Sequence, residues 1–296
     1  MAIAPTKVTP FGGAVFDKDD LLKLDEDLLR ALLRERTHHN IEVPLYTVLA
    51  NGQKQAVPIF GLQAQMVYDA WVERGLPVTD PDFEWVKDNL EIAAKIRSGE
   101  KVEWELPLPE PFTEEELKVV DKLIYQRHSI RDFADKPIPD ELIEKILSAG
   151  RAAPIGCNLD EVRFIVLKKP EELNMIWSDI AVKNAVVIVI AYDKRIPNVV
   201  GQDITVPQNG GFDAAAAGDH MLLMAHALGL GGVWLSKTVE SKVTKNTAQE
   251  FKEKYGLPDF IEIALHLAIG WPALQTIKSK RMPLEKMIIT RDTFKK

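Results

Sequence analysis

Three prolines within five residues divide the sequence into two parts with different patterns. Pro107, Pro109 and Pro111 cannot continue a helix or a central strand, so residues 106–111 favour an extended, semi-rigid connector. A helix is predicted directly afterwards, because Thr113 and Glu116 have the spacing of a capping box and apolar residues then recur at helical spacing. We therefore expect an extension over residues 1–112 and a second domain over residues 113–296.

The extension has the pattern of a helical segment, with little sequence typical of a buried sheet. Helices are predicted over residues 21–33, 61–73 and 82–96. Residues 34–46 hold two arginines, two histidines and a tyrosine, and we expect this segment to lie nearest a substrate. The extension as a whole is expected to form either a lid over a pocket or a belt that reinforces a dimer.

The second part alternates strand-like apolar runs with helices. The runs cover residues 164–167, 186–191, 233–235 and 263–269, which is an α/β-type pattern and suggests a parallel sheet. Two long helices are predicted between them, over residues 213–228 and 239–255. The first is rich in alanine and methionine and is expected to be buried on nearly all sides.

A basic cluster follows the helix that begins near Thr113. Arg127-His128-Ser129-Ile130-Arg131 places two guanidinium groups, a hydroxyl and several backbone N–H groups within five residues. Guanidinium binds phosphate bidentately and stays charged, and serine adds a neutral donor. The cluster therefore suits a phosphate, although a solvated patch is the alternative because helix C-termini favour cations.

The basic cluster is the first of five segments that match one longer pattern in order. The segments are Arg127-His128-Ser129-Ile130-Arg131-Asp132-Phe133, Ala153-Pro154-Ile155-Gly156-Cys157-Asn158, Asp213-Ala214-Ala215-Ala216-Ala217-Gly218, Gly229-Leu230-Gly231-Gly232-Val233-Trp234, and His266-Leu267-Ala268-Ile269-Gly270-Trp271-Pro272 with Lys280-Arg281-Met282-Pro283-Leu284 after it. Together they resemble the nitroreductase superfamily over roughly residues 113 to 290, preceded here by an N-terminal extension.

The resemblance implies an α+β fold of three α-β-α layers with a mostly antiparallel central sheet, which overrides the parallel sheet suggested by the alternation alone. It also implies a homodimer with two FMN molecules at its interface. The residues that the resemblance assigns to FMN are Arg127, His128, Ser129, Arg131, Lys280 and Arg281 at the phosphate, Pro154, Ile155, Gly156 and Asn158 along the ring, and Gly231 and Gly232 opposite.

The activity implied by the resemblance is ping-pong oxidation and reduction. FMN takes a hydride from a donor such as NADH or NADPH and passes electrons to a nitro, quinone-type or other electron-poor aromatic substrate. A reductive dehalogenase is one alternative, and a flavin-binding or regulatory protein without turnover is another. No side chain is assigned a catalytic role, and the extension is expected to help define the substrate pocket.

The ring-binding loop departs from the family pattern. Where the family reads x-Gln-Pro-Trp after the asparagine, this chain has Leu159-Asp160-Glu161-Val162, and Ile155 stands where the family often has serine. The two carboxylates would repel anionic substrates, hold a cationic group or lie solvated in a surface loop, and the solvated loop is the preferred interpretation.

Composition and single residues exclude several other classes of protein. A net charge of −7 argues against nucleic-acid binding, and the run from Ala185 to Ala191 is too short to span a membrane. The only cysteine, Cys157, cannot form an internal disulfide, so a reducing, cytoplasmic location is expected, with Cys157 as a small buried filler. His38 and His39 are expected to point apart, without carboxylates at ligand spacing, and to bind no metal. His226 is expected to pack in the core.

Overall fold

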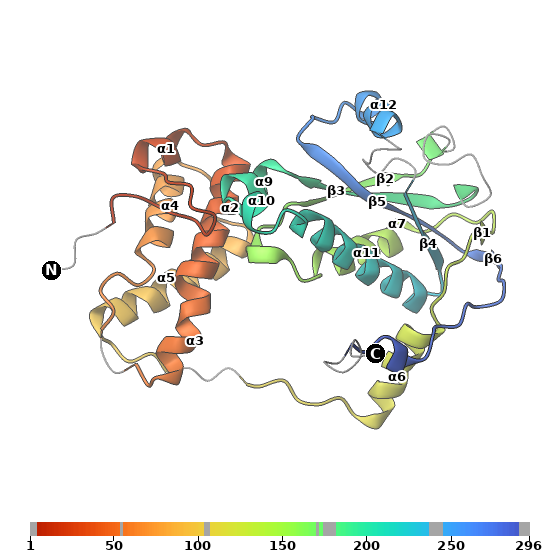
Figure 1. Cartoon of the computed structure of the whole chain (residues 1–296), viewed down its shortest axis with the longest axis horizontal. Helices are drawn as coiled ribbons and strands as arrows, with labels where there is room; N and C mark the ends of the chain where they lie inside the picture. The colour runs from red at the N-terminus through yellow and green to blue at the C-terminus, as the bar shows by residue number, and fades with distance from the viewer. Residues whose placement is uncertain are drawn as a thin grey trace, which may run out of the picture.

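The computed structural model describes residues 5–53, 56–103, 107–169, 172–173, 182–236 and 245–289. Figure 1 shows a group of helices from the N-terminal part beside a sheet with helices on both faces. The extension supplies α1 (Lys18–Lys23), α2 (Glu26–Thr37), η1 (His38–Glu42), α3 (Val43–Ala50), α4 (Leu62–Glu73) and α5 (Pro81–Ser98). The helical character predicted for the extension is therefore confirmed.

The helix predicted over residues 21–33 is broken into α1 and α2. Asp17 and Asp25 each accept a hydrogen bond from a backbone N–H of the following turn, from Asp20 and Asp27, so each begins its own helix. Leu24 between them is extended. The leucine pattern continued across this break because both helices bury leucines in one core, among them Leu21 and Leu29.

The core of the extension also takes in residues from the second part of the chain. Leu159, Ile196 and Val200 belong to the same buried cluster as the apolar residues of α1 to α5. The Gly12 N–H donates to the Val200 carbonyl at 2.9 Å, and Arg195 lies 3.7 Å from Asp25 in an ion pair. The extension is therefore packed firmly on the rest of the chain.

The central sheet has four strands, β2 (Val162–Leu167), β3 (Val186–Asp193), β4 (Gly231–Leu235) and β5 (Ile261–Gly270). Their spatial order is β2-β3-β5-β4, and all neighbouring pairs are antiparallel. The positions of the predicted strands and the antiparallel arrangement are confirmed. The parallel sheet suggested by the alternation is wrong, because a strand–helix pattern fixes which segments pair but not their directions.

Helices cover both faces of this sheet, as Figure 1 shows. Val187 and Val189 of β3 pack with Phe251 of α12 (Lys245–Tyr255) on one face, and Ile188 and Ile190 pack with α7 (Asp140–Arg151) and α11 (Asn209–Ala227) on the other. Side chains alternate between the two faces at the period of a strand. The expected three-layer arrangement is confirmed, while residues 239–244 of the second predicted helix lie outside the described residues.

The helix α11 is buried along one stripe rather than on nearly all sides. Its buried residues, from Gly210 to Ala225, recur at helical spacing on the face toward the sheet, whereas Phe212 is 60% exposed. The expectation of burial all round is therefore wrong for a single copy of the chain. The alanines of residues 214–217 fit a buried and an exposed helix face equally well, so the sequence did not show which face of α11 is exposed.

The remaining elements flank the sheet. The capping box of Thr113 and Glu116 is confirmed at the start of α6 (Glu114–Gln126), and α6 buries no residue. The short β1 (Asp132–Phe133) pairs antiparallel with β6 (Pro272–Leu274), and α9 (Arg195–Val199), α10 (Gln202–Thr205), η2 (Gly156–Asn158) and η4 (Leu284–Lys286) complete the described elements. Within the described ranges, no helix combines the length and the apolar content that crossing a membrane requires.

Candidate functional site

The basic cluster, residues 127–131, lies next to the glycine turn, residues 229–232, at one end of α11. The two segments are about 100 residues apart in the sequence. Ser129 forms a parallel bridge with Gly232, and the Ile130 N–H donates to the Gly232 carbonyl at 3.1 Å. A Cβ on Gly231 would lie 2.7 Å from the Ile130 Cβ, and one on Gly232 would lie 2.6 Å from Leu222 Cδ2. Only glycine permits this approach at position 231, where the neighbouring atom is a Cβ next to the backbone.

A cavity of about 760 Å³ opens beside this junction. The ends of α6 and α11, the cluster and the segment after β6 line it, and its positive side chains are Lys122, Arg127 and Lys278. The described lining holds no carboxylate. The Nε2 atom of His128 is buried here and has no hydrogen-bond partner among the described residues. The cavity is therefore suited to an anion that accepts hydrogen bonds.

The positive charge of this cavity contributes to a lowered pKa of His226. Burial lowers the pKa of His226, and the nearby charges of Arg127, His128 and Lys122 lower it further, against a hydrogen bond to the Lys122 backbone. The prediction that His226 packs in the core is wrong, because its half-buried side chain lies in the cavity wall. Its apolar helix neighbours had suggested complete burial.

The other residues predicted to bind phosphate lie outside the cavity lining in the single chain. Ser129 is held in the bridge to Gly232, and Arg131 is exposed directly before β1. Lys280 and Arg281 are exposed in the segment after β6, and Lys278 of the same basic run reaches the cavity instead. Lys122 and Lys278 were missed, although the density of lysine and arginine in residues 278–281 marked the right segment.

The residues predicted to line the flavin ring lie at the opposite end of α11. The Gly156 N–H donates to the Asp213 Oδ2 atom at 2.9 Å, near the first turns of that helix. Asp213 and His226 are 13 positions apart, so the two sites are separated by about 20 Å along the helix axis. One copy of the chain therefore does not bring Pro154, Ile155, Gly156 and Asn158 to the basic cavity.

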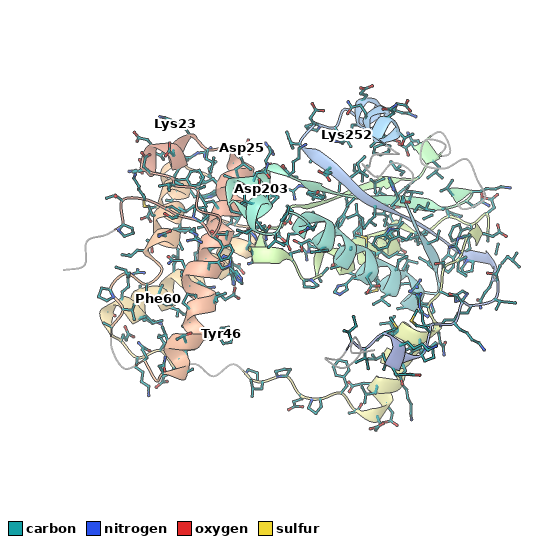
Figure 2. The ribbon with its side chains drawn as sticks, in the orientation of Figure 1. Lys23, Asp25, Tyr46, Phe60, Asp203 and Lys252 are labelled. Atoms are coloured by element: carbon teal, nitrogen blue, oxygen red, sulfur yellow. The ribbon has the colours of Figure 1, made fainter. Side chains whose placement is uncertain are left out.

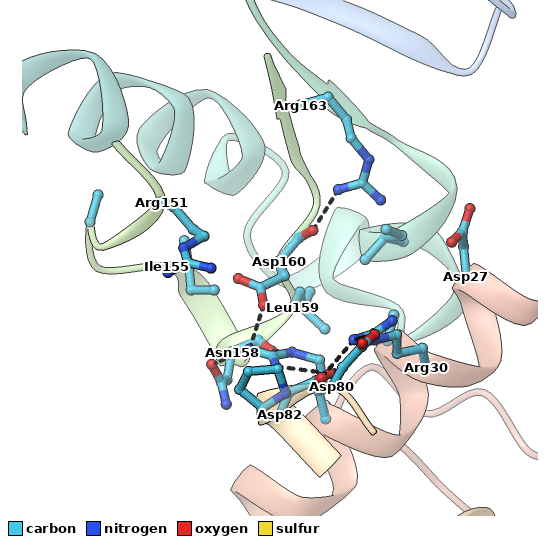
Figure 3. Close-up of a pocket in the computed structure, with 15 residues that line it drawn as sticks. Asp27, Arg30, Asp80, Asp82, Arg151, Ile155, Asn158, Leu159, Asp160 and Arg163 are labelled. Atoms are coloured by element: carbon cyan, nitrogen blue, oxygen red, sulfur yellow. Dashed lines mark hydrogen bonds and ion pairs between the residues drawn. The ribbon is translucent and has the colours of Figure 1, made fainter. Parts of the chain in front are cut away.

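Arg34 of the extension binds the loop that contains Asn158. Arg34 Nε donates to the Asn158 carbonyl at 2.9 Å and Nη2 donates to Asn158 Oδ1 at 2.8 Å, and Nη2 also lies 2.7 Å from Asp160 Oδ2. A cavity of about 780 Å³ lies between the two parts at this point. Figure 3 shows Asn158 and Asp160 in this pocket together with Arg30 and Asp82 of the extension.

The two carboxylates of the altered loop are not simply solvated, so the preferred interpretation is wrong. Asp160 pairs with Arg34, and Glu161 is completely buried. Burial raises the pKa of Glu161 to about 8, helped by the nearby carboxylate of Asp213. Glu161 therefore carries a proton at neutral pH. Sequence spacing alone could not place it inside the strand–helix interface.

The loop is also conformationally unusual. Cys157, Asn158 and Asp160 all have left-handed backbone angles, with φ of 52°, 57° and 54°. Such angles cost energy in residues other than glycine and persist where neighbouring contacts enforce them. Here Arg34 and Asp213 supply those contacts.

Residues 34–46, expected nearest a substrate, divide into two groups. Arg34 and His38 line a cavity of about 490 Å³ together with Trp85, Pro154 and Asn158, whereas Tyr46 is 78% exposed on α3 (Figure 2). Of this segment, residues 34–38 therefore lie beside the predicted ring-binding loop.

The two adjacent histidines behave differently from the prediction. The rings of His38 and His39 meet edge to face with centroids 4.7 Å apart, and each has a carboxylate partner at i±4, Glu42 for His38 and Glu35 for His39. The expectation that the rings point apart without carboxylates nearby is wrong. A π-helical turn at η1 changes the angular spacing that an α-helix would give.

The model of the nitroreductase family matches residues 124–195. A protein of Archaeoglobus fulgidus provisionally named NADH dehydrogenase/NAD(P)H nitroreductase is 31% identical over 156 residues, which cover 51% of this chain and 84% of that protein. A protein of Methanothermobacter thermautotrophicus with the same provisional name is 30% identical, over 51% of this chain and 75% of the relative.

Among solved structures, the NADPH:FMN oxidoreductase of Vibrio harveyi, in complex with NAD⁺, is similar to this chain with a TM-score of 0.50 and 24% identity. The similarity covers 57% of this chain and 76% of that protein. This similarity shows that the two proteins share a fold.

Proposed function

The chain belongs to the nitroreductase family, and from this premise we propose that it is an FMN-dependent enzyme that moves electrons from NAD(P)H to an electron-poor aromatic acceptor. The observation that carries the proposal is the cavity at the end of α11, where the basic cluster meets the glycine turn. The provisional names of the two archaeal relatives support NAD(P)H as the donor.

The residues of the cavity fit a flavin phosphate. Arg127 and Lys278 supply charge, and the unpartnered Nε2 of His128 supplies a hydrogen-bonding atom in a wall without carboxylates. A volume of about 760 Å³ lies within the range of cofactor pockets. When bound, FMN would supply hydride acceptance and electron transfer, and the protein would supply binding, orientation and exclusion of water.

A second copy of the chain would complete this site. The predicted ring residues of one copy lie about 20 Å from its own cavity, and we assign Pro154, Ile155, Gly156 and Asn158 to the FMN held by the other copy. The exposed apolar side chains of α6 and the C-terminal segment, such as Ile124, Ile277 and Leu284, offer a surface for that contact. Ser129, Arg131, Lys280 and Arg281 would join the phosphate in the homodimer.

The extension, residues 1–112, would then form one wall of the acceptor pocket. It holds the ring-binding loop through Arg34 and faces it with Trp85 and His38 across the cavity of about 490 Å³. An aromatic side chain in the wall of this cavity favours a flat aromatic acceptor, such as a nitroaromatic compound or a quinone. Residues 113–296 would form the flavin-binding domain.

The test is spectroscopic. The purified chain, loaded with FMN, is reduced anaerobically by NADH or NADPH and then mixed with nitroaromatics, quinones or halophenols while flavin reoxidation is followed. We expect reduction by at least one nicotinamide and rapid reoxidation by nitroaromatics or quinones. Reoxidation by halophenols alone would identify a dehalogenase, and bound flavin that no donor reduces would identify a protein without turnover. Failure to bind FMN would overturn the proposal.

A further inference from the structure

We propose that the cavity of about 780 Å³ between the extension and the second part of the chain binds a small aromatic carboxylate, and that Arg151 and Arg163 hold its carboxylate group. Arg151 is the last residue of α7, and Arg163 is the second residue of β2. Figure 3 shows both in the lining of this cavity. The proposal concerns binding by two residues to which the proposed electron transfer assigns no role.

The four carboxylates in this lining have arginine partners other than Arg151 and Arg163. The pairs, with N–O distances from 2.6 to 3.6 Å, are Asp27–Arg195, Asp80–Arg30, Asp82–Arg30 and Asp160–Arg34. Within the described ranges, neither Arg151 nor Arg163 takes part in an ion pair. Their two positive charges are therefore the ones that this cavity offers to an anionic ligand.

The guanidinium group of Arg163 is held in position by the loop before β2. Arg163 is half-buried, and its Nη1 donates to the carbonyls of Asp160 at 2.7 Å and of Val162 at 3.0 Å. In the part of the chain that the structure describes, no contact occupies its Nε or Nη2. These two donors form a planar fork that fits both oxygens of a carboxylate. Because the group is already fixed, less entropy is lost when a ligand binds.

A smaller cavity adds an apolar wall to this site. It has a volume of about 260 Å³ and shares Arg151, Ile155, Asp160 and Arg163 with the larger cavity. Its other lining residues are apolar, and they are Gly150, Val162, Phe164 and Ala217. An aromatic ring and aliphatic side chains beside two guanidinium groups suit a flat apolar body with one acidic group. A free phosphate would find few partners on these walls.

The altered loop of residues 159–162 does not oppose an anion here. The Asp160 carboxylate is neutralised by Arg34, with its Oδ2 2.7 Å from Nη2, and Glu161 is completely buried and lines neither cavity. The repulsion of anions that the two carboxylates suggested in the sequence is therefore offset. Cys157 also lines neither cavity and packs against the core of the extension, as the predicted small filler, although its burial is partial.

The experiment measures benzoate binding to the full chain at pH 7 by isothermal titration calorimetry, without added FMN. We expect one benzoate to bind per chain with a Kd of about 1 mM or tighter. Benzamide, which has the same shape and no charge, should bind about tenfold more weakly or less, because it loses the charge-assisted hydrogen bonds. Inorganic phosphate, which lacks the apolar body, should also bind more weakly than benzoate.

Three variants locate the site. We expect Arg163→Gln to weaken benzoate binding by about tenfold or more, and Arg151→Gln, whose side chain is more exposed, by about threefold. The matched control is Lys145→Gln, which removes one positive charge from an exposed position of the same helix α7 and lines neither cavity. That variant should bind benzoate within about twofold of the unchanged protein.

The exposed Arg151 keeps the test valid if Arg163→Gln fails to fold. Benzoate binding that Arg151→Gln and every folded Arg163 variant leave unchanged would place the ligand elsewhere and overturn the proposal. Benzamide binding as tightly as benzoate would overturn it too, and phosphate binding as tightly as benzoate would overturn the assignment to an aromatic carboxylate. Because the titration follows benzoate alone, its failure is distinguishable from a failure to bind FMN.

Discussion

Arg34 holds Asn158 by both its backbone and its side chain, with Nε 2.9 Å from the carbonyl oxygen and Nη2 2.8 Å from Oδ1. The two residues are 124 positions apart, and the contact joins the extension to a loop with left-handed backbone angles. Because guanidinium is planar and presents its donors in a fixed fork, it sets the orientation of the whole residue that it binds. The extension thus helps to fix the conformation of the loop that we propose to contact the flavin ring.

Replacing Arg34 by lysine should loosen the loop. Lysine cannot reproduce the forked contact, so we expect a loss of about 1–3 kcal/mol in the free energy of unfolding, measured in urea, and weaker FMN binding. The matched control is Arg30→Lys, because Arg30 makes a similar forked contact with Asp82 inside the extension. That variant should lose stability and keep its FMN affinity. Equal effects of the two variants on FMN binding would contradict the role of Arg34.

Glu161 should make stability depend on pH. Its pKa is about 8 in the folded chain and 4.5 as a model value, so the folded state binds the proton more tightly. Its contribution is fully present below pH 4.5 and is lost as the pH rises through 8, by an amount on the order of a few kcal/mol. Glu161→Gln, a neutral isostere, should flatten the stability profile between pH 6 and 9. An unchanged profile would show that Glu161 is ionised in the folded chain.

Gly231→Ala should disturb the junction that positions the basic cluster. The new Cβ would lie 2.7 Å from the Ile130 Cβ, and we expect a loss of about 1–3 kcal/mol in the free energy of unfolding together with weaker FMN binding. The control is Gly211→Ala in α11, where the new Cβ meets nothing within 4 Å. That change should stabilise the chain slightly, by about 0.5–1 kcal/mol, because alanine favours the helix. Thermal or urea unfolding of both variants distinguishes these outcomes.

Local sequence patterns predicted the features that neighbouring residues determine. The capping box of Thr113 and Glu116, the four strands and most helices follow from spacing within a few residues. The motif resemblance placed the basic cluster and Gly231–Gly232 in one site, and the Ser129–Gly232 bridge brings those two segments together. Antiparallel pairing required the resemblance, because no local pattern encodes strand direction.

Contacts between distant segments could not be predicted in the same way. Glu161 looked like a surface residue because its neighbour Asp213 is far away in sequence. His38 and His39 looked unremarkable until a π-helical turn brought their rings edge to face, each with a carboxylate partner. Lys278 was overlooked because its neighbours Lys280 and Arg281 matched the family motif better.

The most direct test of the account compares FMN with riboflavin, which lacks the phosphate. If the basic cluster grips the phosphate, the unchanged chain should bind FMN about a hundredfold or more tightly than riboflavin in fluorescence titrations. In the Arg127→Ala/Arg131→Ala variant, tight FMN binding should be lost and the preference should fall to a few-fold, with riboflavin affinity little changed. A double variant that retains the full preference for FMN would contradict the account.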